Sequence, residues 1–172
     1  MLRNLSDKAD FFYRERFKLA TTCTEVRVTR IWEVVIMALM DWEDKYSVKV
    51  LEMDNQHKKI MDMINKLHDA QEQGHGPEVV GATINELVSY TVNHFKDEEA
   101  LMERENFPEL AKHKIIHQQL VKQVGDLSEE FKSKGVEVLP KLMAFLKTWL
   151  TGHILGIDMK YCHHIELKKK AS

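Results

Sequence analysis

The sequence predicts an all-α protein, an up-down-up-down four-helix bundle with an N-terminal extension. Apolar residues recur at spacings of three and four over four long segments, which is the repeat of one helix face. Short helix-breaking stretches separate these segments, and short connections make consecutive helices antiparallel neighbours. The chain has 172 residues, of which 44% are hydrophobic, so its length suits one well-packed domain and is short for two.

We expect the bundle over residues 37–172. Residues 1–36 differ from it because basic residues outnumber acidic ones there, and we interpret them as an extension of unknown role. An alternative is that translation begins at Met37 or Met40 and that the extension is a misassigned start.

Residues that favour helix starts and ends predict the bounds of the first two helices. Residues 42–53 are expected to form a loop-like lead-in, and Asp54 is a favoured N-cap residue for a first helix that runs to about Gln73. The Gly-His-Gly-Pro sequence at 74–77 ends this helix. Its proline suits the first turn of a second helix, which ends near Glu105.

The third helix is expected from about Glu109 to Lys134, where Gly135 stops it. A fourth begins near residues 138–140 and continues to about Gly156, and a short C-terminal helix can follow. The third helix shows the clearest inward row, with steps of three and four throughout: Leu110, His113, His117, Leu120, Val124, Leu127 and Phe131.

Composition excludes several classes of partner. The formal net charge is −2, so the chain lacks the basic surplus that binds nucleic acid or anionic membranes. The longest apolar run, residues 31–40, is too short to span a bilayer and is interrupted by Glu33. Cys23 and Cys162 are too few for a disulfide framework, which favours a reducing compartment. We therefore expect a cytoplasmic monomer.

The inward helix faces carry five of the nine histidines together with two carboxylates. A single histidine on such a face is usually structural, but burying this many unpaired polar groups would cost several kcal/mol each. A bundle of this size has only about 5–15 kcal/mol of net stability to lose. A pair of metal ions resolves the conflict, and we predict as its ligands His57, His94, Glu98, His113, His117, His153 and Asp158.

The ligand types indicate the metal. Zinc favours four ligands and often thiolate, whereas calcium and magnesium favour oxygen. Imidazole mixed with carboxylate favours iron, with manganese as the lesser alternative. The one glutamate followed three residues later by a histidine is Glu72, and its partner His75 lies in the Gly-His-Gly-Pro turn instead of on an inward helix face, so the carboxylate-rich, oxygen-activating site of ferritin-like bundles is not supported.

The spacing of His153 and Asp158 makes a structural prediction. Five residues turn a helix by about 500°, roughly 140° away from the starting face. Both side chains can reach one cluster only if the helix ends or bulges between them, and Gly156 lies where such a break would fall. Glu99 is similarly five residues from His94 and should point elsewhere.

These motifs resemble the hemerythrin family, in particular its single-domain bacterial members, over about residues 40–166. The lead-in WEDKYSV and the run EEALM are also similar to family signatures. The matching ligand motifs are the histidine of DNQH at 54–57, HFKDE at 94–98, HKIIH at 113–117 and HILGID at 153–158.

The resemblance implies a di-iron centre with a bridging oxo or hydroxo group and one open position, where dioxygen binds reversibly. The ligands would divide into three histidines on one iron, two on the other and two bridging carboxylates: His113, His117 and His153; His57 and His94; Glu98 and Asp158.

Reversible binding needs a dry pocket, and the residues that flank the histidines look like the family's pocket lining. They are Phe95, Trp149, Leu150 and Ile154, for which ordinary core packing is the alternative interpretation. No nucleophile or general acid converges on the open position, which favours binding over catalysis. We therefore expect oxygen storage, delivery or scavenging, with an unknown recipient protein. The alternatives are a di-iron enzyme (a ferroxidase, or a reductase of peroxide or nitric oxide) and an oxygen sensor.

Overall fold

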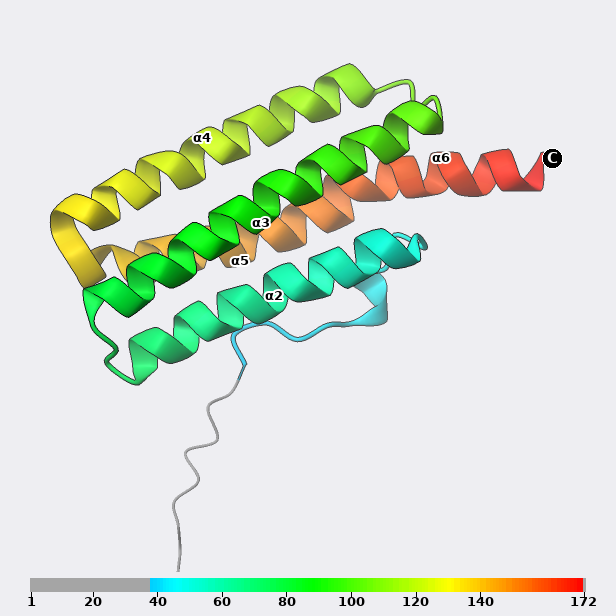
Figure 1. Ribbon diagram of the computed structural model, residues 1–172. Coiled ribbons are helices and arrows are strands. Elements are labelled where there is room, and N and C mark those ends of the chain that lie inside the picture. Colours follow the sequence, from blue (N-terminus) through cyan, green and yellow to red (C-terminus); the bar gives the residue numbers. More distant parts are fainter. Residues whose placement is uncertain (1–37, 172) are drawn as a thin grey trace, which may run out of the picture. The chain divides into compact units, whose positions relative to one another are not determined.

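The computed structural model describes residues 38–171, and every regular element among them is helical (Figure 1). The all-α class is thus confirmed for this part of the chain. The predicted extension over residues 1–36 lies outside it. In chain order the elements are η2 (Asp44–Tyr46), α2 (Leu51–Glu72), α3 (Pro77–Arg104), α4 (Leu110–Lys134), η3 (Gly135–Val138), α5 (Leu139–His153), η4 (Ile154–Asp158) and α6 (Met159–Lys170).

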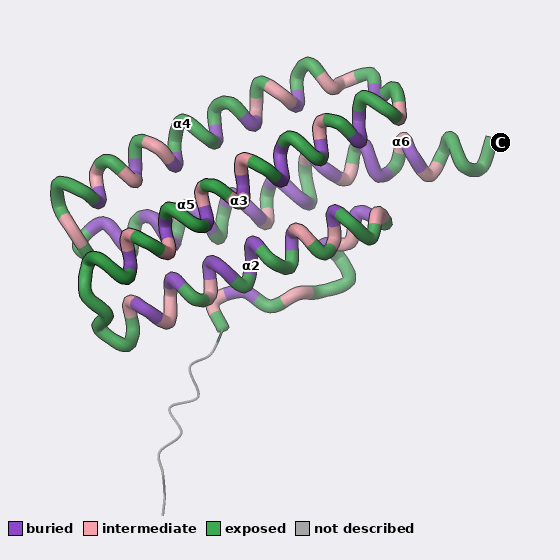
Figure 2. The backbone as a smooth tube through the Cα atoms, viewed as in Figure 1, coloured by how far each residue is buried: buried purple, intermediate pink, exposed green. Residues whose placement is uncertain are grey.

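The long helices lie side by side around a common core. Helix α3 packs against α2 and α4, and α5 packs against α2 and α4. Figure 2 shows buried residues recurring along the inner side of each helix, as the apolar rows predict. A fully buried leucine or isoleucine in such a row contributes about 1.5–3 kcal/mol. None of the described helices is long and apolar enough to cross a membrane.

The turns between helices use backbone conformations that the sequence allows. Helix α4 ends at Gly135, whose φ of 66° lies in the left-handed region that glycine adopts without strain. Helix α3 ends near Asn106, which has a φ of 58° and belongs to a residue type that tolerates this region. Both positions agree with the predicted helix boundaries.

The start of the first long helix differs from the prediction. Helix α2 begins at Leu51, and Asp54 lies within its first turn, so Asp54 is not the N-cap residue. Its carboxylate instead accepts hydrogen bonds from the Val48 backbone N–H at 2.8 Å and from the Ser47 hydroxyl at 2.7 Å. The aspartate thus fastens the lead-in to the helix, and Val48 is buried beside it.

The predicted break before Asp158 is a π-helical turn, η4, and the chain then continues directly into α6. A π turn holds more residues than an α turn and so brings His153 and Asp158 to the same inner side. Both are buried, with His153 Nε2 3.1 Å from Asp158 Oδ1. The bulge is therefore confirmed. The α-helical part of the fourth helix ends at His153, three residues before the predicted end near Gly156, and α6 is the expected short C-terminal helix. Gly156 is exposed and a side chain there would meet no atom within 4 Å, so the turn does not depend on its missing side chain.

Substituting Asp54→Ala should lower the free energy of unfolding by about 1–3 kcal/mol, because the buried Val48 N–H loses its acceptor. Urea or thermal unfolding measures this loss. Glu52→Ala is the matched control, since Glu52 is an exposed acid in the same helical turn and its loss should change stability by less than about 0.5 kcal/mol. Equal effects of the two substitutions would show that the Asp54 contacts contribute nothing.

Candidate metal centre

The structure brings all seven predicted ligand residues together in the interior. Each exposes no more than 5% of its surface. They come from α2, α3, α4, the end of α5 and the π turn, so the cluster joins every long helix. Six of the seven, all but Asp158, form two overlapping groups that share Glu98 and could each hold a metal ion: Glu98, His113, His117 and His153; and His57, His94 and Glu98.

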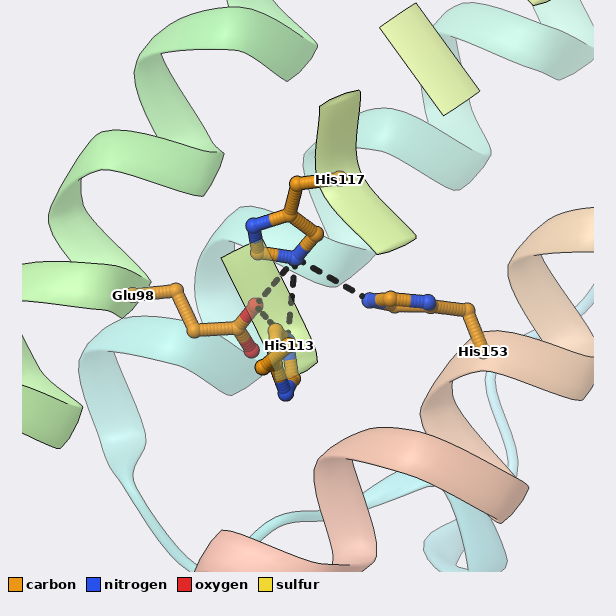
Figure 3. A group of neighbouring side chains, drawn as sticks. All are labelled: Glu98, His113, His117 and His153. Carbon is orange, nitrogen blue, oxygen red and sulfur yellow. Dashed lines mark hydrogen bonds and ion pairs between the residues drawn. The ribbon is translucent and has the colours of Figure 1, made fainter. Parts of the chain in front are cut away.

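The first group contains three imidazoles and one carboxylate (Figure 3). His117 Nε2 lies 3.0 Å from His113 Nε2 and 3.2 Å from His153 Nε2. A metal bonded to imidazole nitrogens at roughly 2.1 Å sets two of them roughly 3.0 Å apart at a right angle and roughly 3.4 Å apart at a tetrahedral angle. Both observed spacings lie within this range, so one ion fits among these nitrogens.

The carboxylates lie between the two groups of histidines. Glu98 Oε2 is 3.3 Å from His113 Nε2 and 3.2 Å from His117 Nε2, and Glu98 also belongs to the group of His57 and His94. The two carboxylate oxygens of Asp158 face different histidine groups. Oδ1 lies 3.1 Å from His153 Nε2, whereas Oδ2 lies 3.6 Å from His57 Nε2. Carboxylates in these positions can bridge two ions.

Several atoms of the cluster are buried and have no hydrogen-bond partner. Both carboxylate oxygens of Glu98 and Asp158 and both ring nitrogens of His57 belong to this set. Leaving such atoms buried and unpaired is costly, and buried charges are normally paired or coordinate metals. The donor set of imidazoles and carboxylates fits iron or a similar transition ion, which would give these atoms a partner.

Burial keeps most of these histidines neutral. It lowers the pKa of His57 to about 3, and that of His94 and His153 to about 4, because a charged imidazole is poorly solvated there. A neutral imidazole has the free lone pair that a metal ligand needs. His117 differs. Burial lowers its pKa, but the carboxylates of Glu98 and Glu99 outweigh this and raise it overall.

The pKa values of the two carboxylates, Glu98 and Asp158, shift in opposite directions. Burial raises the pKa of Asp158 well above its usual value, and the charge of Glu98 adds to this effect. For Glu98 burial acts in the same direction, but the contacts with His113 and His117 outweigh it and hold its pKa well below the usual range. Burial and the neighbouring charge of Glu98 thus oppose ionisation of Asp158, so two ionised bridging carboxylates require added positive charge.

The predicted pocket residues are all buried beside the cluster. Phe95 stacks on His117 with ring centroids 3.8 Å apart, and Trp149 meets Phe95 edge-on at 6.0 Å. Phe95 and Trp149 also line a small apolar cavity between α3, α4 and α5, with about 10 Å³ for the centre of a water-sized molecule. Leu150 and Ile154 are buried but do not line this cavity.

Sequence reasoning missed three residues around the cluster. Glu99 points away from the shared space, as predicted, but its carboxylate lies 2.8 Å from His117 Nδ1. Gln56 contacts His94 Nδ1 in the same way, also at 2.8 Å. Tyr161 is fully buried near His113, with ring centroids 6.2 Å apart. Tyr161 lies three residues after Asp158, and this helical spacing is the signal that could have indicated it.

The four remaining histidines belong to neither ligand group. His75 and His163 are exposed and His68 is half-buried. His164 is half-buried and donates a hydrogen bond to the Glu105 carbonyl at 3.1 Å.

Comparison with known proteins agrees with this geometry. The family model described as the hemerythrin HHE cation binding domain matches residues 48–164. The bacteriohemerythrin of Methylococcus capsulatus is 38% identical over 126 residues, which cover 73% of this chain and 95% of that protein. The bacteriohemerythrin of Pseudomonas aeruginosa is 39% identical over 125 residues, covering 73% and 80%.

A less similar relative and a solved structure belong to the same family of proteins by their names. The myohemerythrin of Riftia pachyptila is 33% identical over 120 residues, covering 70% of this chain and 88% of that protein. A crystal structure of wild-type hemerythrin aligns with a TM-score of 0.67 and 37% identity over 72% of this chain and 95% of that one. The match of the family model spans the segment that contains all seven clustered residues, and together with these relatives it shows that the chain belongs to the hemerythrin family.

Proposed function

We propose that this chain binds dioxygen reversibly at a pair of non-haem iron ions, within an up-down-up-down four-helix bundle. The observation that carries the proposal is the pair of overlapping buried ligand groups that share Glu98, with the oxygens of Asp158 turned toward both. A lone ion would leave one of the two groups without a partner. The hemerythrins among its relatives support the choice of iron and dioxygen.

The two groups are unequal, and the inequality supports a binding role. Three imidazoles, two carboxylate oxygens and a solvent-derived bridging oxygen would complete six positions around one ion. We assign these imidazoles to His113, His117 and His153. Only His57 and His94 remain for the second ion, which keeps one position open for a small ligand.

When bound, a reduced iron pair would supply the two electrons that reversible binding of dioxygen needs. The residues of the chain keep this binding reversible by excluding water and stray protons. Phe95 stacks on His117, Trp149 lies 6.0 Å from His153 between ring centroids, and Leu150 and Ile154 add buried apolar side chains on either side of His153 in the sequence. Tyr161 stays protonated, because burial and then the charges of Glu98 and Asp158 raise its pKa well above the usual value. These features favour oxygen storage, delivery or scavenging over catalysis.

The direct test is repeated oxygenation. The purified full-length chain should hold two irons, colour when the reduced protein meets air, and bleach when oxygen is removed, over several cycles. A di-iron oxidase would instead end ferric after one exposure. One iron per chain, or none after anaerobic reconstitution with ferrous salt, would disprove the proposal.

His57→Ala and His94→Ala should each abolish oxygen binding, because they remove one of the two imidazoles assigned to the open ion. Iron analysis and the visible spectrum after exposure to air measure the effect. His75→Ala is the control, since His75 is exposed and outside both groups, and it should behave as the unaltered protein. Full oxygen binding by either cluster variant would refute the assignment.

Leu150→Ala should leave both irons bound but speed their autoxidation, because the removed side chain opens the dry surround to water. Leu142→Ala is a matched control two turns earlier on α5, equally buried, and either change should cost about 2–5 kcal/mol of stability. Autoxidation is followed as loss of the oxygenated spectrum. If both variants autoxidise at the unaltered rate, the pocket assignment of Leu150 is wrong.

Metal binding should also release protons at neutral pH. His57, His94 and His153 have lowered pKa values, are already neutral and have none to give. Asp158 and His117 have raised pKa values, so each keeps its proton to a higher pH than a free side chain and gives it up on becoming a ligand. We expect release of about one to two protons per chain, measured by titration with Co²⁺ in weakly buffered solution with a pH indicator.

Asp158→Asn supplies the internal comparison, because an asparagine has no proton to lose. This variant should release fewer protons than the unaltered chain for each ion bound. Proton uptake, or equal release by the two proteins, would contradict the protonation assigned to Asp158.

A further inference from the structure

In each ligand group, one imidazole makes a hydrogen-bonding contact through its Nδ1 with a side chain outside the cluster. In the three-histidine group, His117 Nδ1 lies 2.8 Å from a carboxylate oxygen of Glu99. In the two-histidine group, His94 Nδ1 lies 2.8 Å from the amide oxygen of Gln56. Both contacts leave Nε2 of the same ring free to face the cluster.

The partners fix which ring nitrogen carries the proton. A carboxylate and an amide oxygen can only accept hydrogen bonds, so Nδ1 is the donor in both rings and Nε2 is the nitrogen left to bind a metal. The orientation of the Gln56 amide is consistent with this, because its nitrogen donates to the Asp97 carboxylate at 3.0 Å. Such outer partners orient metal-binding histidines and raise their basicity.

The two partners differ in charge. Glu99 places a carboxylate behind His117, whereas Gln56 places a neutral amide behind His94 and is itself tied to Asp97. A hydrogen bond to a carboxylate is about twice as strong as one between neutral groups. It pushes more electron density toward the far nitrogen, and a metal held by that nitrogen is stabilised in its higher oxidation state.

We propose that Glu99 is a positioning residue that strengthens His117 as a metal ligand, and that Gln56 holds His94 without adding charge. The two halves of the centre are thereby made electronically unequal by residues that touch no metal. The inference rests on the proposed di-iron function and deepens it, because it assigns control of the reduction potential and of metal affinity to Glu99.

Glu99 is well placed for a test that spares the core. Its side chain is 24% exposed and borders a surface cleft of about 290 Å³ between α3 and α4, which His117 and Lys96 also line. A substitution there therefore opens no cavity in the apolar interior. Glu103 is an exposed carboxylate one turn later on α3, and Glu103→Ala controls for the loss of surface charge alone.

The experiment compares Glu99→Gln, Glu99→Ala and Glu103→Ala in the full-length chain. Glu99→Ala should weaken binding of Co²⁺ to the metal-free protein by about 10–100-fold, the usual effect of losing such a partner. Glu99→Gln keeps the hydrogen bond but not the charge. It should bind more tightly than Glu99→Ala and, with iron loaded, show a midpoint potential shifted upward. Glu103→Ala should match the unaltered protein in both measurements.

The converse change adds a carboxylate beside His94 and so tests the role of Gln56 in the two-histidine group. Gln56→Glu combined with Asp97→Asn preserves one donor and one acceptor between these two side chains while placing a carboxylate behind His94. This double variant should shift the midpoint potential downward. A merely structural role for the contacts would not move the potential in opposite directions in the two variants.

Failure of the inference is distinguishable from failure of the proposed function. If the unaltered chain holds two irons and cycles with oxygen, but Glu99→Gln and Glu99→Ala retain its Co²⁺ affinity and its potential, the role of Glu99 is disproved and the di-iron function stands. If the unaltered chain fails to hold two irons, the function itself is disproved.

Discussion

The structure depends on neutralising a cluster of polar groups inside an apolar core. Glu98 and Asp158 are fully buried, and none of their carboxylate oxygens accepts a hydrogen bond. Five buried imidazoles surround them. Burial raises the pKa of Asp158, whereas the contacts with His113 and His117 hold the pKa of Glu98 low. Two cations would replace this arrangement with direct bonds to every donor.

The fold meets this demand by taking ligands from all of its long helices. No single helix can present seven donors to one point, but α2, α3, α4 and the α5–η4–α6 segment each present one or two. The π turn supplies the last of these ligands. It lets two residues that are five apart share a face, which a regular α-helix does not allow.

Around the ligands lies a layer that sets their chemistry. Phe95 covers one face of His117, while Glu99 and Gln56 hold the outer nitrogens of His117 and His94. Apolar burial lowers histidine pKa values and so keeps lone pairs available, and it also limits the access of water. The same feature, a dry surround, therefore prepares the site to bind metal and favours reversible use of a gas.

The sequence by itself determined the all-α class, the boundaries of α3 and α4 and the set of residues that meet inside, because helical periodicity and residue type are local properties. Even the distortion before Asp158 followed from a spacing of five residues. Only the tertiary structure decided that Asp54 fastens the lead-in instead of capping α2, that the helix continues past Gly156, and that Glu99 and Gln56 anchor two imidazoles. These features arise from contacts between separate segments or from competition between possible hydrogen-bond partners, and no local pattern encodes which partner is chosen.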